Sequence, residues 1–259
     1  MNSFERRNKI VDMVNASGKV FVTQLSNTFE ISEVTIRSDL RQLEKKGLLT
    51  RFHGGASKIA EEPAQTAALP NELMLEERYQ QAMEPKKRIA ILAASFVKPG
   101  DTIILDSGST TMLLAQELVK IDNITVITNN LPAAFALSEN KEITLFVCGG
   151  TLRHKTRSMH GSITEQSLNG IAADLMFVGA DGIDAEKGIT TFNDGYAISG
   201  VMASRAHRVI AVIDASKFGR SGFNQVLPID KLDTIITDEG ISERDKAAFQ
   251  KQNITVLTA

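Results

Sequence analysis

Seven short runs of apolar, mostly β-branched residues alternate with amphipathic stretches from Thr102 to the C-terminus. A continuous apolar run of four or five residues is typical of a strand that is buried on both faces, and helices between such strands supply the cover. We therefore predict an α/β fold with a mainly parallel sheet. The expected strands are Thr102 to Leu105, Ile124 to Thr128, Ile143 to Val147, Leu175 to Val178, Val209 to Ile213, Thr234 to Thr237 and Ile254 to Leu257, and the expected helices lie near 110–119, 132–139, 163–169, 197–207 and 242–251.

The loop after the first of these strands is rich in hydroxyl side chains. Ligands of open parallel sheets bind at the carboxyl ends of the strands, and a following helix offers free N–H groups and a positive dipole end to an anion. A helix cap would need one Ser or Thr, whereas this loop holds four. The pattern favours a phosphate-binding loop, and its candidate residues are Asp106, Ser107, Gly108, Ser109, Thr110 and Thr111.

Four further strand-end loops contribute candidates for the same site. A basic run from Thr151 to Arg157 follows a glycine pair; such runs are usually solvated, but this one begins at a strand end. A lysine at the end of the strand from Val209 to Ile213 could complete a phosphate site. The further candidates are Thr128, Asn129, Gly149, Gly150, Arg153, Asp181, Gly182 and Lys217.

A separate signal lies near the N-terminus, where the segment from Ser32 to Gly47 reads as one helix with a serine N-cap and a glycine end. Ile36, Leu40 and Leu43 form a buried stripe at helical spacing. The opposite side carries groups that the DNA major groove can use: hydroxyl, guanidinium and methyl. With the following alternating run, the DNA-binding candidates are Glu33, Val34, Thr35, Arg37, Ser38, Arg41, Arg51 and His53.

A charged outer face is also typical of an ordinary solvated surface helix. The neighbouring segments therefore decide whether this helix is a DNA-binding one. Arg6 to Ala16 is amphipathic, Thr23 to Phe29 reads as a short helix capped by Thr23, and a tight turn separates it from Ser32. The alternating residues from Leu48 to Gly55 suit a β-wing. Three helices and a wing in this order predict a winged helix-turn-helix that binds double-stranded DNA.

Composition supports a division into two parts. Residues 1–58 hold ten Lys/Arg against six Asp/Glu, and the remainder holds nineteen against twenty-five, which fits a nucleic-acid-binding head on an acidic body. The segment from Ser57 to Asn71 reads as a linker; a helix is possible from Glu72 to Met83, and another is expected from Lys86 to Val97 after Pro85. We predict a DNA-binding domain at 1–57, a linker with a helix at 58–85 and an effector domain at 86–259.

The single cysteine, Cys148, ends an apolar run and is expected to be a buried thiol. It excludes an intrachain disulfide framework, and nothing indicates a metal or another cofactor. No run approaches membrane-spanning length and no signal core precedes the first helix, so we expect no membrane partner and a cytoplasmic location. Dimers or tetramers are expected, because one recognition helix reads too few base pairs for specificity.

The motifs together resemble the DeoR family of bacterial sugar-metabolism repressors. The head motif is Arg6-x3-Ile10-x3-Val14 followed by Ser32-x2-Thr35-Ile36-Arg37-Ser38-Asp39-Leu40 and Arg51-x2-Gly54-Gly55, and the body carries DSGSTT, TNN, GGTLR, FVGADGID and DASKF. The resemblance covers essentially the whole chain. It implies a body related in fold to ribose-5-phosphate isomerase, a sugar phosphate held by the segment 107–111 and Lys217, and Asp181 near the sugar hydroxyls. Ser38 departs from the longer polar residue common in the family, which bears on operator choice.

Three functions are compatible with these features. The first is a repressor that a phosphorylated sugar or sugar alcohol releases from its operator. The second is a sugar-phosphate isomerase or deaminase with an appended head, for which Asp181 or His160 would have to act as the base. In this chain Tyr196 stands where the family commonly has a glutamate, which puts catalysis in doubt, and an enzyme has no use for an outward Arg37. The third, an adaptor that binds protein through the basic helix, would need an apolar patch, and Val34 is the one apolar residue there. We predict the repressor and no enzymatic activity.

Overall fold

The computed structural model describes residues 3–45, 48–52, 54–57, 75–192, 198–222 and 224–259. The chain divides into two compact units, residues 1–68 and residues 69–259, which are described separately below. Among the helices in these described ranges, none combines the length and the apolar character that crossing a bilayer requires.

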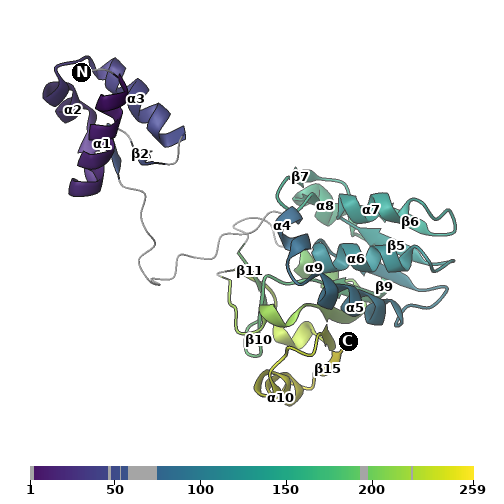
Figure 1. Cartoon of the computed structure of the whole chain (residues 1–259). Coiled ribbons are helices and arrows are strands. Elements are labelled where there is room, and N and C mark those ends of the chain that lie inside the picture. Colours follow the sequence, from purple (N-terminus) through teal and green to yellow (C-terminus); the bar gives the residue numbers. More distant parts are fainter. Residues whose placement is uncertain (1–2, 46–47, 53, 58–74, 193–197, 223) are drawn as a thin grey trace. The chain divides into compact units, whose positions relative to one another are not determined.

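The first unit consists of three helices and a small antiparallel sheet (Figure 1). Its strands pair in the order β1-β3-β2. Residues spaced three or four apart on the helices meet in one apolar core, which includes Ile10, Val14, Leu25, Ile36 and Leu40. The elements are α1 (Ser3–Ser17), β1 (Lys19–Phe21), α2 (Val22–Phe29), α3 (Glu33–Lys45), β2 (Thr50–Phe52) and β3 (Gly55–Ser57).

This arrangement confirms the predicted winged helix-turn-helix, with one correction. The expected stripe of α3 is buried, and the hydroxyl of Ser32 accepts the N–H of Thr35 at 3.3 Å, as an N-cap does. The prediction that Thr23 caps α2 is wrong, because the helix begins one residue earlier. The Thr23 hydroxyl lies inside the helix and donates to the Glu33 carboxylate at 3.1 Å, so it joins α2 to α3 instead.

The second unit is built on a seven-stranded sheet in the order β15-β14-β12-β9-β4-β5-β6, in which every neighbouring pair is parallel. Apolar side chains are buried on both of its faces, which explains why its central strands read as continuous apolar runs. The strands are β4 (Thr102–Leu105), β5 (Thr125–Thr128), β6 (Thr144–Val147), β9 (Ala173–Val178), β12 (Ala206–Val212), β14 (Thr234–Thr237) and β15 (Thr255–Thr258).

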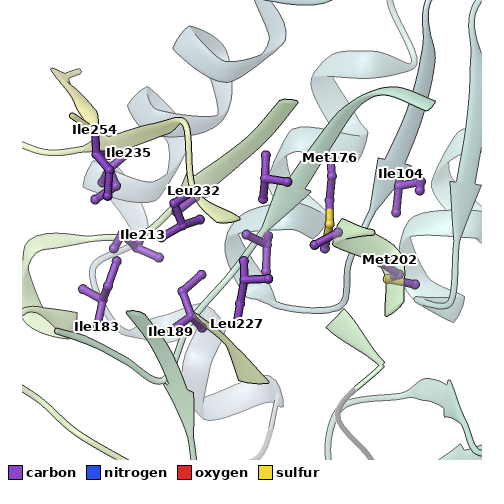
Figure 2. Packing of buried hydrophobic residues seen from close by; sticks show 14 of the residues in the cluster. Ile104, Met176, Ile183, Ile189, Met202, Ile213, Leu227, Leu232, Ile235 and Ile254 are labelled. Carbon is purple, nitrogen blue, oxygen red and sulfur yellow. The ribbon is translucent and has the colours of Figure 1, made fainter. Parts of the chain in front are cut away.

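Different elements cover the two faces of this sheet. One face packs against helices α5 (Met83–Ala94), α6 (Ser109–Leu118) and α7 (Leu131–Leu137). The other packs against α9 (Ser199–Ala203) and α10 (Glu243–Lys251), and against Leu168 and Ile171, which follow α8 (Ser162–Ser167). A small antiparallel sheet of β10 (Gly182–Asp184), β11 (Gly188–Thr191) and β13 (Asn224–Leu227) packs on this second face. Figure 2 shows its residues Ile183, Ile189 and Leu227 among the core side chains.

Seven predicted strands are therefore confirmed, each within a few residues of its expected bounds. The small sheet and the hairpin of β7 (Thr151–Arg153) and β8 (Ser158–His160) were not predicted. The helix expected at 197–207 is shorter than predicted. It ends at Ala203 because the chain from Ala206 pairs with β9 as the first part of β12.

The segment expected to link the two parts is partly folded onto the second unit. Helix α4 (Leu75–Gln80) precedes α5, and the amide of Leu75, a buried residue, donates to the carbonyl of Lys155 at 3.0 Å. Pro85 does not separate two helices as predicted. It lies in the first turn of α5, where its missing N–H would have no partner within the helix. The predicted linker residues 58–74 lie outside the described part of the chain.

Candidate functional site

The first candidate surface is the outer side of α3. Val34 is 77% exposed, and Arg37, Ser38 and Arg41 are exposed as well. The guanidinium of Arg37 lies 2.8 Å from the Glu33 carboxylate one turn earlier, and this pair lowers the pKa of Glu33. An exposed pair of this kind contributes little to stability. Arg37 is therefore held near the start of the helix, where it remains accessible to a partner.

Two further candidates on the head have different surroundings. The Thr35 hydroxyl is half-buried and lies 3.0 Å from the hydroxyl of Ser32, so it shares in the cap. Arg51, in β2, lies 3.5 Å from the Glu44 carboxylate through its guanidinium and donates its backbone N–H to the same side chain at 3.1 Å. His53 lies outside the described residues.

A buried ion pair that was not predicted ties the head together. Asp39, on α3, accepts hydrogen bonds from the guanidinium of Arg6 at 2.6 Å and from that of Arg7 at 2.8 Å. The Asp39 side chain is 3% exposed. The pattern of apolar spacing cannot reveal such a contact, because both partners are charged and lie 33 positions apart. It fixes α1 against the recognition helix.

The second candidate site is a cavity in the second unit, residues 69–259, at the carboxyl ends of β4, β9 and β12. It holds about 110 Å³, several times the roughly 10–15 Å³ that one water needs. Among the described residues, five cationic side chains and three carboxylates line it, which leaves a net positive charge. These charged residues are Arg78, Lys86, Arg153, Lys217, Arg220, Asp106, Asp181 and Asp214.

The predicted phosphate-binding loop forms one wall of this cavity. Ser107, Gly108, Ser109 and Thr110 line it at the start of α6, where the first N–H groups of a helix lack partners within the helix. The combination of free N–H groups, hydroxyls and a helix dipole is suited to a phosphate group. This wall is therefore an anion-binding surface by its chemistry.

Asp106 lies behind the loop and is almost completely buried. Its carboxylate accepts the N–H of Ser107 at 2.7 Å and the hydroxyl of Ser199 at 2.6 Å. Burial, which outweighs these two hydrogen bonds, raises its pKa from 3.8 to about 6. Ser199, which begins α9, was not predicted as a site residue.

Two lysines of the cavity approach the same carboxylate, that of Asp214. Lys217 Nζ lies 4.0 Å and Lys86 Nζ lies 3.8 Å from Asp214 Oδ2. Burial lowers the pKa of both lysines, to about 8 for Lys86, and the Asp214 charge opposes this effect. Lys86 was predicted as the start of a helix and not as a site residue. Its side chain is 2% exposed and reaches the cavity from α5.

Asp181, which follows β9, also lines the cavity and has several partners. Its carboxylate lies 2.8 Å from the guanidinium of Arg78, and it accepts the Thr191 hydroxyl at 2.6 Å and the Phe192 N–H at 3.3 Å. The hairpin of β7 and β8 closes the cavity with Arg153, Thr156 and His160. Arg153 thus comes from the basic run that was expected to be either a site or a solvated surface.

Among the described residues, six of the predicted effector ligands do not line the cavity. Thr111 and Thr128 turn their hydroxyls to the backbone carbonyls of Gly108 and Leu105, at 3.1 and 2.7 Å. The Asn129 amide donates to the carbonyl of Met159 at 3.0 Å. These hydrogen bonds join the side chains to the backbone of neighbouring loops. The six residues are Thr111, Thr128, Asn129, Gly149, Gly150 and Gly182.

Two glycines of this set, Gly150 and Gly182, lie where the backbone of another segment approaches closely. A Cβ on Gly150, which has φ +133°, would lie 2.7 Å from the carbonyl oxygen of His160. A Cβ on Gly182 would lie 2.3 Å from the carbonyl oxygen of Arg220. Both glycines therefore bring a cavity residue of another segment into place. Asp184, close to Gly182 in the sequence, accepts the N–H groups of Glu186 and Lys187 and so stabilises the turn between β10 and β11.

Metal ligands and the single cysteine are the remaining candidates for chemistry in the described ranges. No group of three or more His, Cys, Asp or Glu side chains there is arranged to hold a metal ion. Cys148 is buried as predicted, and burial raises its pKa to about 11, which disfavours the thiolate that a nucleophile needs. Tyr196 lies outside the described residues.

A winged helix-turn-helix and a parallel-sheet unit with a cationic cavity define a class of protein, the transcriptional regulators that carry a small-molecule sensor domain. The chain belongs to the DeoR family of these regulators. Residues 6–62 match the DeoR-like helix-turn-helix domain, and residues 81–239 match the DeoR C terminal sensor domain. The chain is therefore a sugar-related transcriptional repressor of this family and not an enzyme.

Relatives that match nearly the full length of the chain are also named as transcriptional repressors or regulators. The chain is 35% identical to a putative aga operon transcriptional repressor from Escherichia coli O157:H7, over 98% of this chain and 93% of that protein. It is 33% identical to the HTH-type transcriptional regulator GolR from Listeria innocua over 100% of both chains. It is 34% identical to a lactose phosphotransferase system repressor from Streptococcus mutans, over 92% and 93% of the two chains.

Solved structures show more distant likenesses. Ribose 5-phosphate isomerase A from Methanocaldococcus jannaschii is 20% identical, with a TM-score of 0.39, over 52% of this chain and 54% of its own. A probable sor operon regulator from Shigella flexneri is 10% identical, with a TM-score of 0.40, over 72% and 88% of the two chains. At these values neither structure bears on what the cavity binds.

Proposed function

We propose that this chain represses an operon for the use of a sugar or sugar alcohol, and that a phosphorylated effector bound in the cavity releases it from its operator. The observation that carries the proposal is that Ser107 to Thr110, at the start of α6, line the same cavity as the cations Lys217, Lys86 and Arg78. Hydroxyls, free N–H groups and a surplus of cations suit a phosphate ester better than a neutral sugar.

The carboxylates of the cavity would recognise the hydroxyl groups of the effector. Asp181 and Asp106 are acceptors that hydroxyls of a polyol could reach, while the cations hold the phosphate. Galactitol is our proposed substrate of the pathway, because the segments MNSFERRNKIV, TRFHGGA, LPAAFALSENK and RHKTRSMHGS resemble the galactitol-utilisation repressor of enteric bacteria. One of the relatives named above is a lactose phosphotransferase system repressor, which supports a sugar-derived effector.

The head would bind the operator through the outer face of α3 and the wing, with Glu33, Val34, Thr35, Arg37, Ser38, Arg41 and Arg51 as the proposed contacts. A homodimer or homotetramer in the cytoplasm would place two heads on paired half-sites, because one recognition helix reads too few base pairs. Effector binding releases the protein when the effector prefers the form that does not bind DNA.

The experiment is a calorimetric titration of the full chain with a panel of hexitol and hexose monophosphates, together with operator binding by gel shift. We expect a phosphorylated member to bind and to release the operator, and the unphosphorylated sugars to do neither. Lys217→Ala should still bind the operator but resist release. The matched control is Lys251→Ala, an exposed lysine of α10, which should behave like the wild type. Equal binding of phosphorylated and unphosphorylated sugars would refute the proposal.

A further inference from the structure

Helix α4 is the first described element of the second unit along the chain (Figure 1). Three contacts join it to residues of the cavity. At its start, the amide of Leu75 donates to the carbonyl of Lys155, between β7 and β8. That hairpin also supplies Arg153, Thr156 and His160 to the cavity. The beginning of α4 is therefore fixed to a part of the cavity wall.

The second contact is made by Lys86, a buried lysine of α5 that binds backbone carbonyls at the end of α4. Lys86 Nζ donates to the carbonyls of Arg78 and Gln81, each at 2.7 Å. A cation that binds the last carbonyls of a helix is favourably placed. The same ammonium group lies 3.8 Å from Asp214 at the base of the cavity. Lys86 thus connects the end of α4 with the residues that surround Lys217.

The third contact lies between these two. The Arg78 side chain is 17% exposed, lines the cavity and reaches Asp181 at 2.8 Å. Asp181 keeps two other donors, the Thr191 hydroxyl and the Phe192 N–H. A ligand with a phosphate and hydroxyl groups competes for both partners, because its phosphate accepts from a guanidinium and its hydroxyl donates to a carboxylate.

We propose that Arg78 is a ligand of the effector carried on α4, and that its transfer from Asp181 to the effector changes the position of α4 and so reports that the cavity is occupied. The inference rests on the proposed function and adds the route by which the signal leaves the cavity. The head precedes α4 in the sequence, and in this proposal a change at α4 alters how strongly the head binds the operator. The effector needs only to favour one of the two positions of α4 to shift operator binding.

The first test measures coupling and not binding alone. The affinity of galactitol 1-phosphate is determined for the free protein and for the protein saturated with operator, and the ratio of the two is the coupling factor. Factors of about 5–150 are typical of allosteric proteins. In Arg78→Gln, which keeps one amide donor for Asp181, we expect the factor to fall towards one. Arg88→Gln, an exposed arginine of α5, is the matched control and should keep the wild-type factor.

The second test follows α4 directly. The chain has no tryptophan, so Gln80→Trp places a single reporter at an exposed position of α4. We expect its fluorescence spectrum to change when galactitol 1-phosphate is added, and to change less when Arg78→Gln is also present. Phe135→Trp, at a side chain of α7 that is 76% exposed and does not line the cavity, should show no change.

The outcomes separate the two proposals. Suppose that the wild-type protein binds the phosphorylated probe and releases the operator. If Arg78→Gln then retains the full coupling factor, or if the fluorescence of the reporter at residue 80 does not change, the proposed role of α4 is wrong and the proposed function stands. If neither galactitol 1-phosphate nor any other member of the hexitol and hexose monophosphate panel binds the wild-type protein, both fail. Thermal unfolding of each variant shows whether a loss of coupling reflects loss of the fold.

Discussion

The Nε atom of Arg6 lies 2.6 Å from Oδ2 of Asp39, and this contact joins the first helix of the head to the inner side of its recognition helix. Arg7 approaches the other carboxylate oxygen at 2.8 Å. Such a carboxylate is costly to bury without its partners, and the two arginines are costly to leave without the carboxylate. The orientation of α3 in the head therefore depends on a charged cluster as well as on its apolar stripe.

Asp39→Asn should destabilise the head selectively. Removing one partner of a buried ion pair costs roughly 3–5 kcal/mol, and we expect the lower end because Arg7 is partly exposed. A unit of this small size has little stability to lose. Operator binding should be lost at 37 °C, whereas calorimetric binding of the effector should persist. The control is Asp12→Asn, an exposed residue of α1. Full operator binding by Asp39→Asn would show that the cluster is dispensable.

Arg37→Ala should lower operator affinity by roughly 1–3 kcal/mol if Arg37 contacts a base. Its pair with Glu33 is exposed, so the thermal stability of the head should change little. Fluorescence anisotropy with operator DNA at fixed salt measures the affinity. Arg244→Ala, an exposed arginine of α10, serves as the matched control. An unchanged affinity for Arg37→Ala would exclude a base contact.

Arg51→Ala should behave differently, since the wing is expected to face phosphates. Binding to operator and to unrelated DNA should weaken by similar factors, and the slope of log affinity against log salt should decrease by about one. The pair with Glu44 is long, at 3.5 Å, so the guanidinium can exchange this partner for a phosphate at little cost. Salt titrations with both DNAs distinguish the two arginines. A selective loss for the operator would instead place Arg51 at a base.

The sheet could be predicted from the sequence because burial on both faces imposes a simple pattern. Ile103, Ile104 and Leu105 are each fully buried, and such runs are hard to mistake for surface structure. The missed elements have no such pattern. β7 and β10 are three residues long, and Arg153 and Gly182 belong to them, so neither propensity nor alternation indicates a strand.

The cavity residues that directly follow strands could be predicted from the sequence, and the others could not. The loop from Ser107 to Thr110 and Lys217 sit at strand ends, which parallel topology gathers at one edge. Arg78 and Lys86 come from helices that were assigned to a linker or to general packing. Only the tertiary contacts of α4 and α5 bring them into the site, and a single sequence does not contain those contacts.

Asp106→Asn should reveal the electrostatic cost of the buried carboxyl through its pH dependence. Burial raises the pKa of Asp106 to about 6, so the folded protein binds this proton more tightly than the unfolded chain does. The contribution of this group to stability is therefore fully present below about pH 4 and is lost as the pH rises through about 6. At pH 7.5 the charged form costs up to about 3 kcal/mol, from roughly 1.4 kcal/mol per pKa unit.

Asparagine has the same shape, accepts the N–H of Ser107 and can accommodate Ser199, so Asp106→Asn should stabilise the second unit at pH 7.5 by up to that amount. The gain should shrink between pH 6 and pH 4 and vanish below it. Urea unfolding across this range, followed by circular dichroism, measures the difference. Asp230→Asn, at an exposed position, should show no comparable gain. If Asp106→Asn destabilises the unit at pH 7.5, the hydrogen bonds to the charged carboxylate outweigh its burial, and Asp106 is ionised at that pH without penalty.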